Sequence, residues 1–286
     1  MQYNSVFVDE KYSKIVEPNL YGDAILQPGI SCNDVYSGDA ASGLVKIYRI
    51  IRDAAEDPKT PAGEFVHAEK ANELIDLRLN NAFRKSKKIF QVTANAVPYK
   101  LAEETLQVAV MDNAEDRQYS GLACLAKEGT TSGDTAAITA ANVKSKVVAI
   151  RKEVRKSHAK ADTAIASVDV FAAMLESAGS SYTPVANDNT LTTGRIGKWL
   201  GMTWYEGDLL DNATAKYYDH TGTLQTVDLT KVELMIYDHR AFHIVDNLVA
   251  QRVVDATDFV GSYAQNEINT GFRVSNAKCA VIKTKA

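Results

Sequence analysis

Cysteine is scarce in this chain of 286 residues, which contains Cys32, Cys124 and Cys279 and no others. Their number is odd, they are far apart in the sequence, and no CxxC pair occurs. Neither a disulfide framework nor a zinc knuckle is therefore indicated. We expect reduced and mostly buried thiols, because free cysteine packs as a small apolar side chain.

Long apolar runs are also missing. No stretch of about 18 apolar residues could cross a membrane, and the start, MQYNSVFVDEKY, lacks the basic region and apolar run of a signal peptide. We therefore expect a protein that is made and kept in the cytoplasm and has no membrane partner. The net charge of -4 argues against a protein whose main activity is to grip duplex DNA by its phosphates.

The signature motifs of catalysis and nucleotide binding are absent as well. GRIGKWLG contains Gly194, Gly197 and Gly201, but neither GxGxxG nor GxxxxGK(S/T) occurs, and a turn into a strand explains these glycines better. There is also no GxSxG elbow. We predict no catalytic residue, no cofactor and no enzyme activity.

The segment YDHRAFH offers the strongest alternative, a metal or catalytic site. It contains Asp238, His239 and His243, and on a helix the two histidines would share one face. However, HExxH is absent, no third ligand is evident, and the preceding VELMI is typical of a strand. We predict no bound metal; a cytoplasmic enzyme of another family, with its site around these histidines, stays the alternative.

The residues that are present describe a globular protein. Hydrophobic residues make up 45% and charged residues 24%, and the length predicts about two domains or one elaborated domain. Helix and strand patterns mix without the βαβ rhythm of a parallel sheet, which favours the α+β class. Residues 1–43 show no sustained periodicity, and we interpret them as an arm that needs a neighbouring surface to become ordered.

Residues 44–92 predict a long two-stranded ribbon. LVKIYRIIR at 44–52 is rich in branched and aromatic residues, and residues 75–79 alternate apolar and polar side chains with the period of two of a half-buried strand. DPKTPAG at 57–63 favours a loop between them. Because a lone ribbon is only marginally stable in water, this one must lie on another surface.

A long helix is predicted next, from Pro98 to Gly129, with proline in its first turn and glycine just after its end. About 30 residues make a rod of about 45 Å, in which Gly121 is a candidate kink. A second, amphipathic helix is predicted at 140–158, where apolar residues recur with helical spacing: Val143, Val147, Ile150 and Val154.

Shorter elements complete the pattern. Residues 163–166 predict a strand, and VDVFAAMLESA predicts a helix that Ser167 caps and Gly179 ends. Further strands are predicted at 200–205, 232–238 and 278–283, whereas 241–254 is ambiguous.

Three stretches stand out by their order along the chain. LIDLRLNNAFRKSKKIF at 74–90 leads into the helix from Pro98; IASVDVFAAMLESAG at 165–179 is followed by GRIGKWLGMTWYEGDLL at 194–210; GFRVSNAKCAVIK lies at 271–283. In this order they resemble the Hong Kong 97 type fold of tailed-phage major capsid proteins. They would be the descending strand of its extended loop, its strand, short helix and turn, and its closing strand.

The resemblance implies a division of the chain into named parts. These are an N-terminal arm at 1–43, the extended loop at 44–92, a peripheral domain with the spine helix at 93–129, an axial domain at 130–260, and a closing strand at 261–286 that returns to the peripheral domain. It also implies many copies in hexamers and pentamers of an icosahedral virion shell. The shell would assemble in the bacterial host cytoplasm, with a portal, and enclose double-stranded DNA without binding it sequence-specifically. An encapsulin-like compartment, which encloses protein, is the alternative with the same fold.

Two groups of charged residues are candidate contact sites. Asp57 and Lys59 in the loop tip, and the basic cluster Arg84, Lys85, Lys87 and Lys88, are candidate intersubunit contacts. Lys144, Arg151 and Arg155 form a candidate basic stripe beside the apolar face of the helix at 140–158. The stripe would contact DNA or scaffold, or would be a solvated or ion-paired face. Because the chain enters the arm directly after Met1, we expect a separate scaffolding protein.

Overall fold

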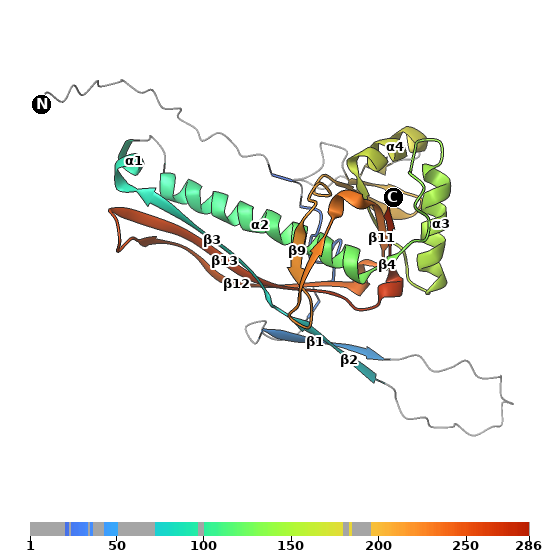
Figure 1. The fold of residues 1–286 in the computed structure, drawn as a ribbon, viewed down its shortest axis with the longest axis horizontal. Helices are drawn as coiled ribbons and strands as arrows, with labels where there is room; N and C mark the ends of the chain where they lie inside the picture. The colour runs from blue at the N-terminus through green and yellow to red at the C-terminus, as the bar shows by residue number, and fades with distance from the viewer. Residues whose placement is uncertain are drawn as a thin grey trace, which may run out of the picture.

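The computed structural model of this chain describes residues 21–22, 24–33, 35–36, 43–50, 72–96, 100–179, 183–184 and 196–285. Most of the predicted arm, the loop tip with Asp57 and Lys59, and also Pro98 and Gly194, lie outside these residues. None of the described helices is long and apolar enough to span a membrane. Figure 1 shows an elongated molecule, in which a long helix and a narrow sheet extend from a compact region of helices and strands.

The described strands form a seven-stranded sheet, a three-stranded sheet and two two-stranded ribbons. The order in the largest sheet is β4 (Thr130–Thr131), β14 (Ala280–Thr284), β11 (Val232–Tyr237), β5 (Thr163–Ser167), β8 (Met202–Gly207), β7 (Ile196–Trp199) and β6 (Thr183–Pro184). β4 is parallel to β14 and β5 to β8, and the other neighbours are antiparallel. The sheet is therefore mixed, as expected for an α+β chain.

Both faces of this sheet are buried, because successive side chains of its central strands point into two different apolar clusters. In β11, Leu234 and Ile236 pack in the cluster that contains side chains of helices α3 (Val143–Lys156) and α4 (Val168–Ala178). Met235 packs in the other cluster, which also contains side chains from the C-terminal part of helix α2 (Leu101–Glu128). We call the seven-stranded sheet with α3 and α4 the body.

The two helices of the body follow the sequence patterns that predicted them. The buried residues of α3 are the four apolar residues of its predicted face, Val143, Val147, Ile150 and Val154. Helix α4 has the predicted bounds, between Ser167 and Gly179. Gly179 has a φ of 48°, a left-handed conformation that glycine adopts at little cost after a helix end.

The long helix α2 lies along a three-stranded sheet with the order β12 (Phe242–Asp255), β13 (Gly261–Val274) and β3 (Asn81–Phe90). We call α2 and this sheet the wing. With 28 residues, α2 is about 42 Å long, and Figure 1 shows it running from the far end of the wing into the body. The short helix α1 (Gln91–Ala96) follows β3 at the far end.

Gly121 allows close packing against α2, which is continuous through this residue. A Cβ atom at Gly121 would lie 2.4 Å from Leu26 Cδ1 and 3.1 Å from Phe272 Cε1. Because Gly121 has no side chain, Leu26 and Phe272 of β13 can pack directly against the helix at this position.

The predicted strand at 74–90 is two strands that belong to different sheets. β2 (Asn72–Arg78) pairs with β1 (Leu44–Ile50) in one ribbon, whereas β3 pairs with β13. Between them, the amide of Asn81 bonds both backbone groups of Tyr218, at 3.1 Å and 2.7 Å. Tyr218 belongs to a second ribbon, formed by β9 (Ala215–Tyr218) and β10 (Leu224–Val227). This contact redirects the chain, so the residues predicted as one extended loop form the first ribbon and an edge of the wing.

Two other segments also take their structure from distant partners. The ambiguous residues 241–254 form the edge strand β12, which pairs with β13 along its length. The predicted closing strand bends: β13 ends at Val274 in the wing, and after the turn η5 (Ala277–Cys279) β14 lies inside the seven-stranded sheet of the body. Strand β8 begins at Met202 because Leu200 and Gly201, both with positive φ, form its turn with β7.

Candidate assembly surface

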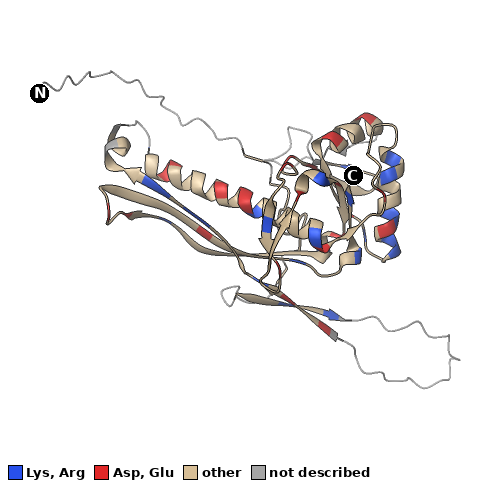
Figure 2. Ribbon diagram, viewed as in Figure 1, with Lys and Arg blue, Asp and Glu red and all other residues tan. Residues whose placement is uncertain are grey.

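The predicted basic cluster lies on β3, where its side chains form ion pairs within the subunit. Lys85 Nζ lies 2.6 Å from Asp116 Oδ2 and Lys87 Nζ 2.6 Å from Asp112 Oδ2, so β3 is tied to α2. Figure 2 shows the acidic positions of α2 and the basic positions of β3 side by side. Although burial raises the pKa of Asp112, hydrogen bonds from Lys87 and Tyr21 hold it below its ordinary value.

The other two members of the cluster point away from α2. Arg84 pairs with Glu267 at 2.8 Å, and Lys88 lies 3.5 Å from Asp258. Their side chains are 69% and 54% exposed, so both are accessible to another molecule. A contact between this cluster and a neighbouring subunit stays a prediction.

An ion pair between the buried Arg117 and the partly exposed Asp246 joins α2 to the edge strand of the wing near its base. Arg117 donates from Nε and Nη2 to the two carboxylate oxygens of Asp246, at 2.8 Å and 2.6 Å, and Thr270 donates to the same carboxylate at 2.7 Å. Further out, buried Asn113 donates to the backbone and side chain of Asn266 on β13. The C-terminal part of α2 is therefore held by apolar packing, whereas Asn113 and Arg117, earlier in the helix, are held by polar contacts.

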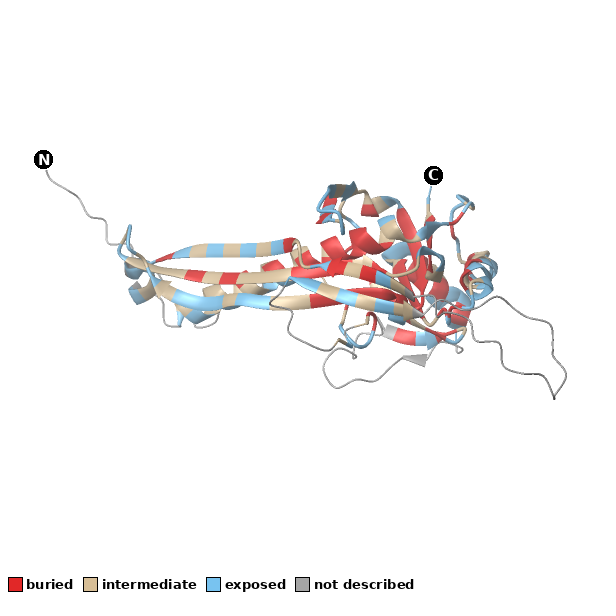
Figure 3. Cartoon of the chain, turned by 90° about the horizontal axis from the view of Figure 1, so that it is seen from below, coloured by how far each residue is buried: buried red, intermediate tan, exposed pale blue. Residues whose placement is uncertain are grey.

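Large apolar side chains are exposed on the edge of the wing and on one face of the first ribbon. Leu248, Val249 and Val253 lie on β12, whose ladder is irregular between Leu248 and Ala250. Tyr48 and Leu74 oppose one another in the ribbon, 53% and 57% exposed. Figure 3 shows pale exposed stretches along the wing and strong burial in the body. Exposed apolar side chains on an unpaired strand edge are typical of a contact surface.

The opposite face of the ribbon is anchored to the wing. Ile75 and Leu77 are buried, and a Cβ atom on Gly271 of β13 would lie 2.4 Å from Leu77 Cδ2. Glycine at this position therefore permits close approach of ribbon and sheet. As expected from its marginal stability, the ribbon lies on another surface, and that surface is partly its own subunit.

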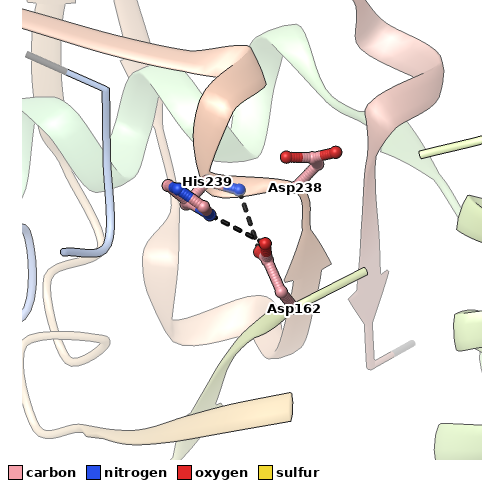
Figure 4. A group of neighbouring side chains, drawn as sticks. All are labelled: Asp162, Asp238 and His239. Carbon is pink, nitrogen blue, oxygen red and sulfur yellow. Dashed lines mark hydrogen bonds and ion pairs between the residues drawn. The ribbon is translucent and has the colours of Figure 1, made fainter. Parts of the chain in front are cut away.

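A carboxylate and histidine cluster lies at one end of the body sheet. Asp162, Asp238 and His239 bring ligand atoms within 4.8 Å of one another. Figure 4 shows that Asp162, from the start of β5, points to the backbone and ring of His239 in the turn η4 (His239–Ala241). Its carboxylate accepts from His239 N at 3.1 Å and contacts His239 Nδ1 at 2.8 Å. The sequence pattern contained Asp238 and His239 but gave no third ligand; in the structure the third residue of the cluster is Asp162.

The carboxylate of Asp238 is occupied by hydrogen bonds. It accepts from Arg240 N, Nε and Nη2 and from Lys160 N, at distances of 2.8 Å to 3.2 Å. Although burial raises the pKa of Asp238, these donors lower it to about 2. The geometry is that of a turn cap and ion pair, which leaves little capacity to bind a cation.

His243 is not part of this cluster, because it lies on a strand and not on the helix that would align it with His239. It is buried on β12, and its Nδ1 lies 2.6 Å from the hydroxyl of Tyr36. Burial lowers the pKa of His243 to about 4, which favours a neutral ring. The two histidines of the alternative enzyme site therefore have separate environments.

No protein-family model matches this chain, and no curated protein matches its sequence. Solved structures match it closely in fold. A structure from Mycobacterium phage Che8 is 15% identical, with a TM-score of 0.66 over 99% of this chain and 98% of that chain. The capsid structure of cyanophage P-SCSP1u is 11% identical, with a TM-score of 0.65 over 98% and 93%. The capsid of an empty GTA (gene transfer agent) particle is 11% identical, with a TM-score of 0.66 over 98% and 95%.

This chain has the tailed-phage capsid fold. The prediction of a Hong Kong 97 type fold from the order of weak motifs is confirmed, because the match extends over nearly the whole chain and its counterparts. In this capsid fold α2 is the predicted spine helix, although the described helix begins at Leu101.

The residues of the predicted basic stripe all lie on α3, but their surroundings differ. Lys144 is exposed in the first turn of α3, whereas Arg155 donates to Ala159 O at 3.0 Å beyond the helix end. Arg151 is half-buried, and a Cβ atom on Gly201 would lie 3.5 Å from its Nη2. Figure 2 shows basic positions along α3 interrupted by an acidic one. A contact of this stripe with DNA or scaffold stays a prediction.

Proposed function

We propose that this protein is a major capsid protein whose copies assemble into the icosahedral shell of a phage or a related particle. The observation that carries the proposal is the end-to-end match to capsid structures: at least 93% of each chain in the pairs with cyanophage P-SCSP1u and the GTA particle is covered. A catalytic domain added to the fold would leave part of this chain unmatched. The role is therefore structural, in the virion capsid.

The shape of the subunit supports self-assembly. A wing of one helix on three strands buries little apolar surface by itself, and its edge strand carries exposed apolar residues. Long, thin elements of this kind gain stability when they are covered by neighbours, and a symmetric shell supplies the same neighbour to every copy. An icosahedral shell requires pentamers at its twelve vertices, and a shell of more than 60 copies adds hexamers between them.

The division into parts is proposed on the same basis. The body corresponds to the axial domain at 130–260, the wing to the peripheral domain around the spine helix, and the first ribbon to the extended loop. β12 and β14 connect these parts. β12 falls within residues 130–260 but lies in the sheet of the wing, whereas β14 falls within residues 261–286 but lies in the sheet of the body.

Assembly partners and cargo follow from the proposal. The protein would assemble in the host cytoplasm around packaged double-stranded DNA, with a portal and a separate scaffolding protein. The net charge of -4 agrees with DNA that is enclosed without sequence-specific binding.

Electron microscopy of the purified protein, alone and co-expressed with its neighbouring genes, tests the proposal. Closed shells, tubes or capsomer rings are expected, and small monodisperse particles under all conditions would refute a shell subunit. Nuclease-protected DNA inside native particles is expected; protein cargo without DNA would instead indicate an encapsulin-like compartment.

A further inference from the structure

The seven-stranded sheet has an acidic end. β5 and β8 run parallel and end at Ser167 and Gly207, and β11 begins beside them, because Leu234 pairs with Ala166. Among the described residues, a cleft at this end is lined by four carboxylates, Asp169, Asp208, Asp211 and Glu233, and by one lysine, Lys285. The cleft has a volume of about 420 Å³ and a net negative lining.

One of these carboxylates is buried without a full set of partners. Glu233 is 7% exposed, and its Oε2 lies 3.3 Å from Lys283 Nζ but accepts no hydrogen bond from the described residues. Lys283 is fully buried and donates to Asp134 O at 2.9 Å. Lys283 compensates the charge of Glu233, so the negative charge that this cleft presents to another molecule includes that of the exposed Asp169 and Asp211.

The opposite end of the same sheet is basic. Because β5 has five residues, this end lies about 17 Å away along the strands. α3 ends here, with Ser157 Oγ donating to Lys278 O at 2.8 Å, and Lys160 N bonds Asp238. Four exposed cations meet at this end: Arg155, Lys156, Lys160 and Lys278. In the described residues none of the four has an ion-paired carboxylate.

Three carboxylates lie near the basic end: Asp162 and Asp238, which are paired inside a turn, and Glu153 on α3, which is exposed and leaves an excess of positive charge. Asp162 is bonded to His239, and Asp238 is ion-paired with Arg240 at 2.8 Å, as Figure 4 shows for the first pair. Their charges are satisfied inside the turn, so the exposed surface at this end is set by the lysines and Arg155.

We propose that the acidic cleft of one subunit receives the basic end of the next, in a head-to-tail contact between the bodies of two copies. The inference rests on the proposed function and names the surfaces that join subunits within a capsomer. Opposite charges at opposite ends of one rigid sheet generate a heterologous interface, and such an interface closes into a ring when the rotation between copies is right.

Charge reversal at each end tests the contact. The acidic-end variant carries Asp169→Lys and Asp211→Lys; the basic-end variant carries Lys156→Glu and Lys160→Glu. Each should lower the yield of shells or capsomers at least tenfold at low salt, because like charges then face each other. A variant that carries all four changes should recover assembly, since the complementary pair is restored with its ends exchanged.

Mixing the two single-end variants sharpens the test. The acidic-end variant then has two basic ends, and the basic-end variant has two acidic ends. The two variants can therefore alternate around a ring with an even number of subunits but not around a pentamer. Hexameric rings, tubes or flat sheets without closed shells are therefore expected from the mixture. Lys216→Glu, an equally exposed charge reversal on β9 outside the body sheet, is the matched control and should assemble normally.

The outcomes separate this contact from the proposed function. Circular dichroism and thermal unfolding must first show that each variant is folded as the wild type is. If the wild type forms no assemblies, the shell function itself fails. If the wild type assembles and either single-end variant does so with unchanged yield, or if the fourfold variant fails to recover, the head-to-tail contact is overturned.

Discussion

In the body, side chains from both faces of one sheet form two apolar clusters, whereas in the wing one helix lies on three strands and polar pairs follow one another along the helix. The buried residues of α2 show the transition: Leu122 to Leu125 belong to an apolar cluster, while Asn113 and Arg117 are buried in polar contacts. A layered body can exclude water by itself. A thin wing cannot, and it remains adapted to contact with other copies.

The comparison predicts that removal of an apolar side chain from the body has the largest effect. Trp204 is fully buried, its ring centroid lies 5.5 Å from that of Trp199, and its Nε1 donates to Trp199 O. Trp204→Ala should lower the free energy of unfolding of the unassembled subunit by about 4 kcal/mol. Urea denaturation measures this change, with Trp204→Phe as the milder control. A loss below about 1 kcal/mol would show that the body is not the stable part.

The ion pair of the buried Arg117 with the partly exposed Asp246, at the base of the wing, should come next. Arg117→Ala leaves the carboxylate of Asp246 without its bidentate partner, and we expect a loss of about 3 kcal/mol. Arg84→Ala is the matched control on the exposed side of the wing, with an expected change below about 0.5 kcal/mol. If Arg117→Ala and Arg84→Ala lowered the free energy of unfolding equally in the same denaturation experiment, the prediction that the buried arginine contributes more would be wrong.

The burial of His243 predicts a pH dependence of stability. The pKa of His243 falls from 6.5 to about 4 on folding because the ring is buried. Between these values the unfolded chain binds a proton that the folded chain does not, so the free energy of unfolding decreases as the pH falls, by at most about 3 kcal/mol. The contribution is fully present above pH 6.5. Thermal unfolding from pH 7 to pH 4 should show a shallower slope for His243→Gln than for the wild type; parallel slopes would refute the shift.

The smallest effect on the subunit is expected from the ion pairs between β3 and α2. Lys85 and Lys87 are about one-third exposed, so replacement of both by Gln should change the free energy of unfolding by less than about 1 kcal/mol. Shell yield of the same variant tests their predicted role between subunits. A normal yield would leave them as contacts within the subunit, and a loss of shells with unchanged stability would support the intersubunit role.

Much of the body could be predicted from sequence because its signals are local. Four valine and isoleucine residues at helical spacing define α3, and Ser167 and Gly179 delimit α4. The alternative metal site shows the limit of the same reasoning. Asp238, His239 and His243 are close in sequence, but the residue that contacts His239 is Asp162, which is distant along the chain and has no motif to reveal it.

The sequence by itself determined the main helices, several strands and, through their order, the capsid fold, because the periods of 3.6 and 2 are set by the backbone within a few residues. Only the tertiary structure decided how those segments pair. Residues 72–90 are divided between a ribbon and the wing, β14 enters the body sheet, and Lys85 and Lys87 contact α2. Pairings of this kind depend on which distant surfaces meet when the chain closes, and the free energy of that closure is a property of the whole fold.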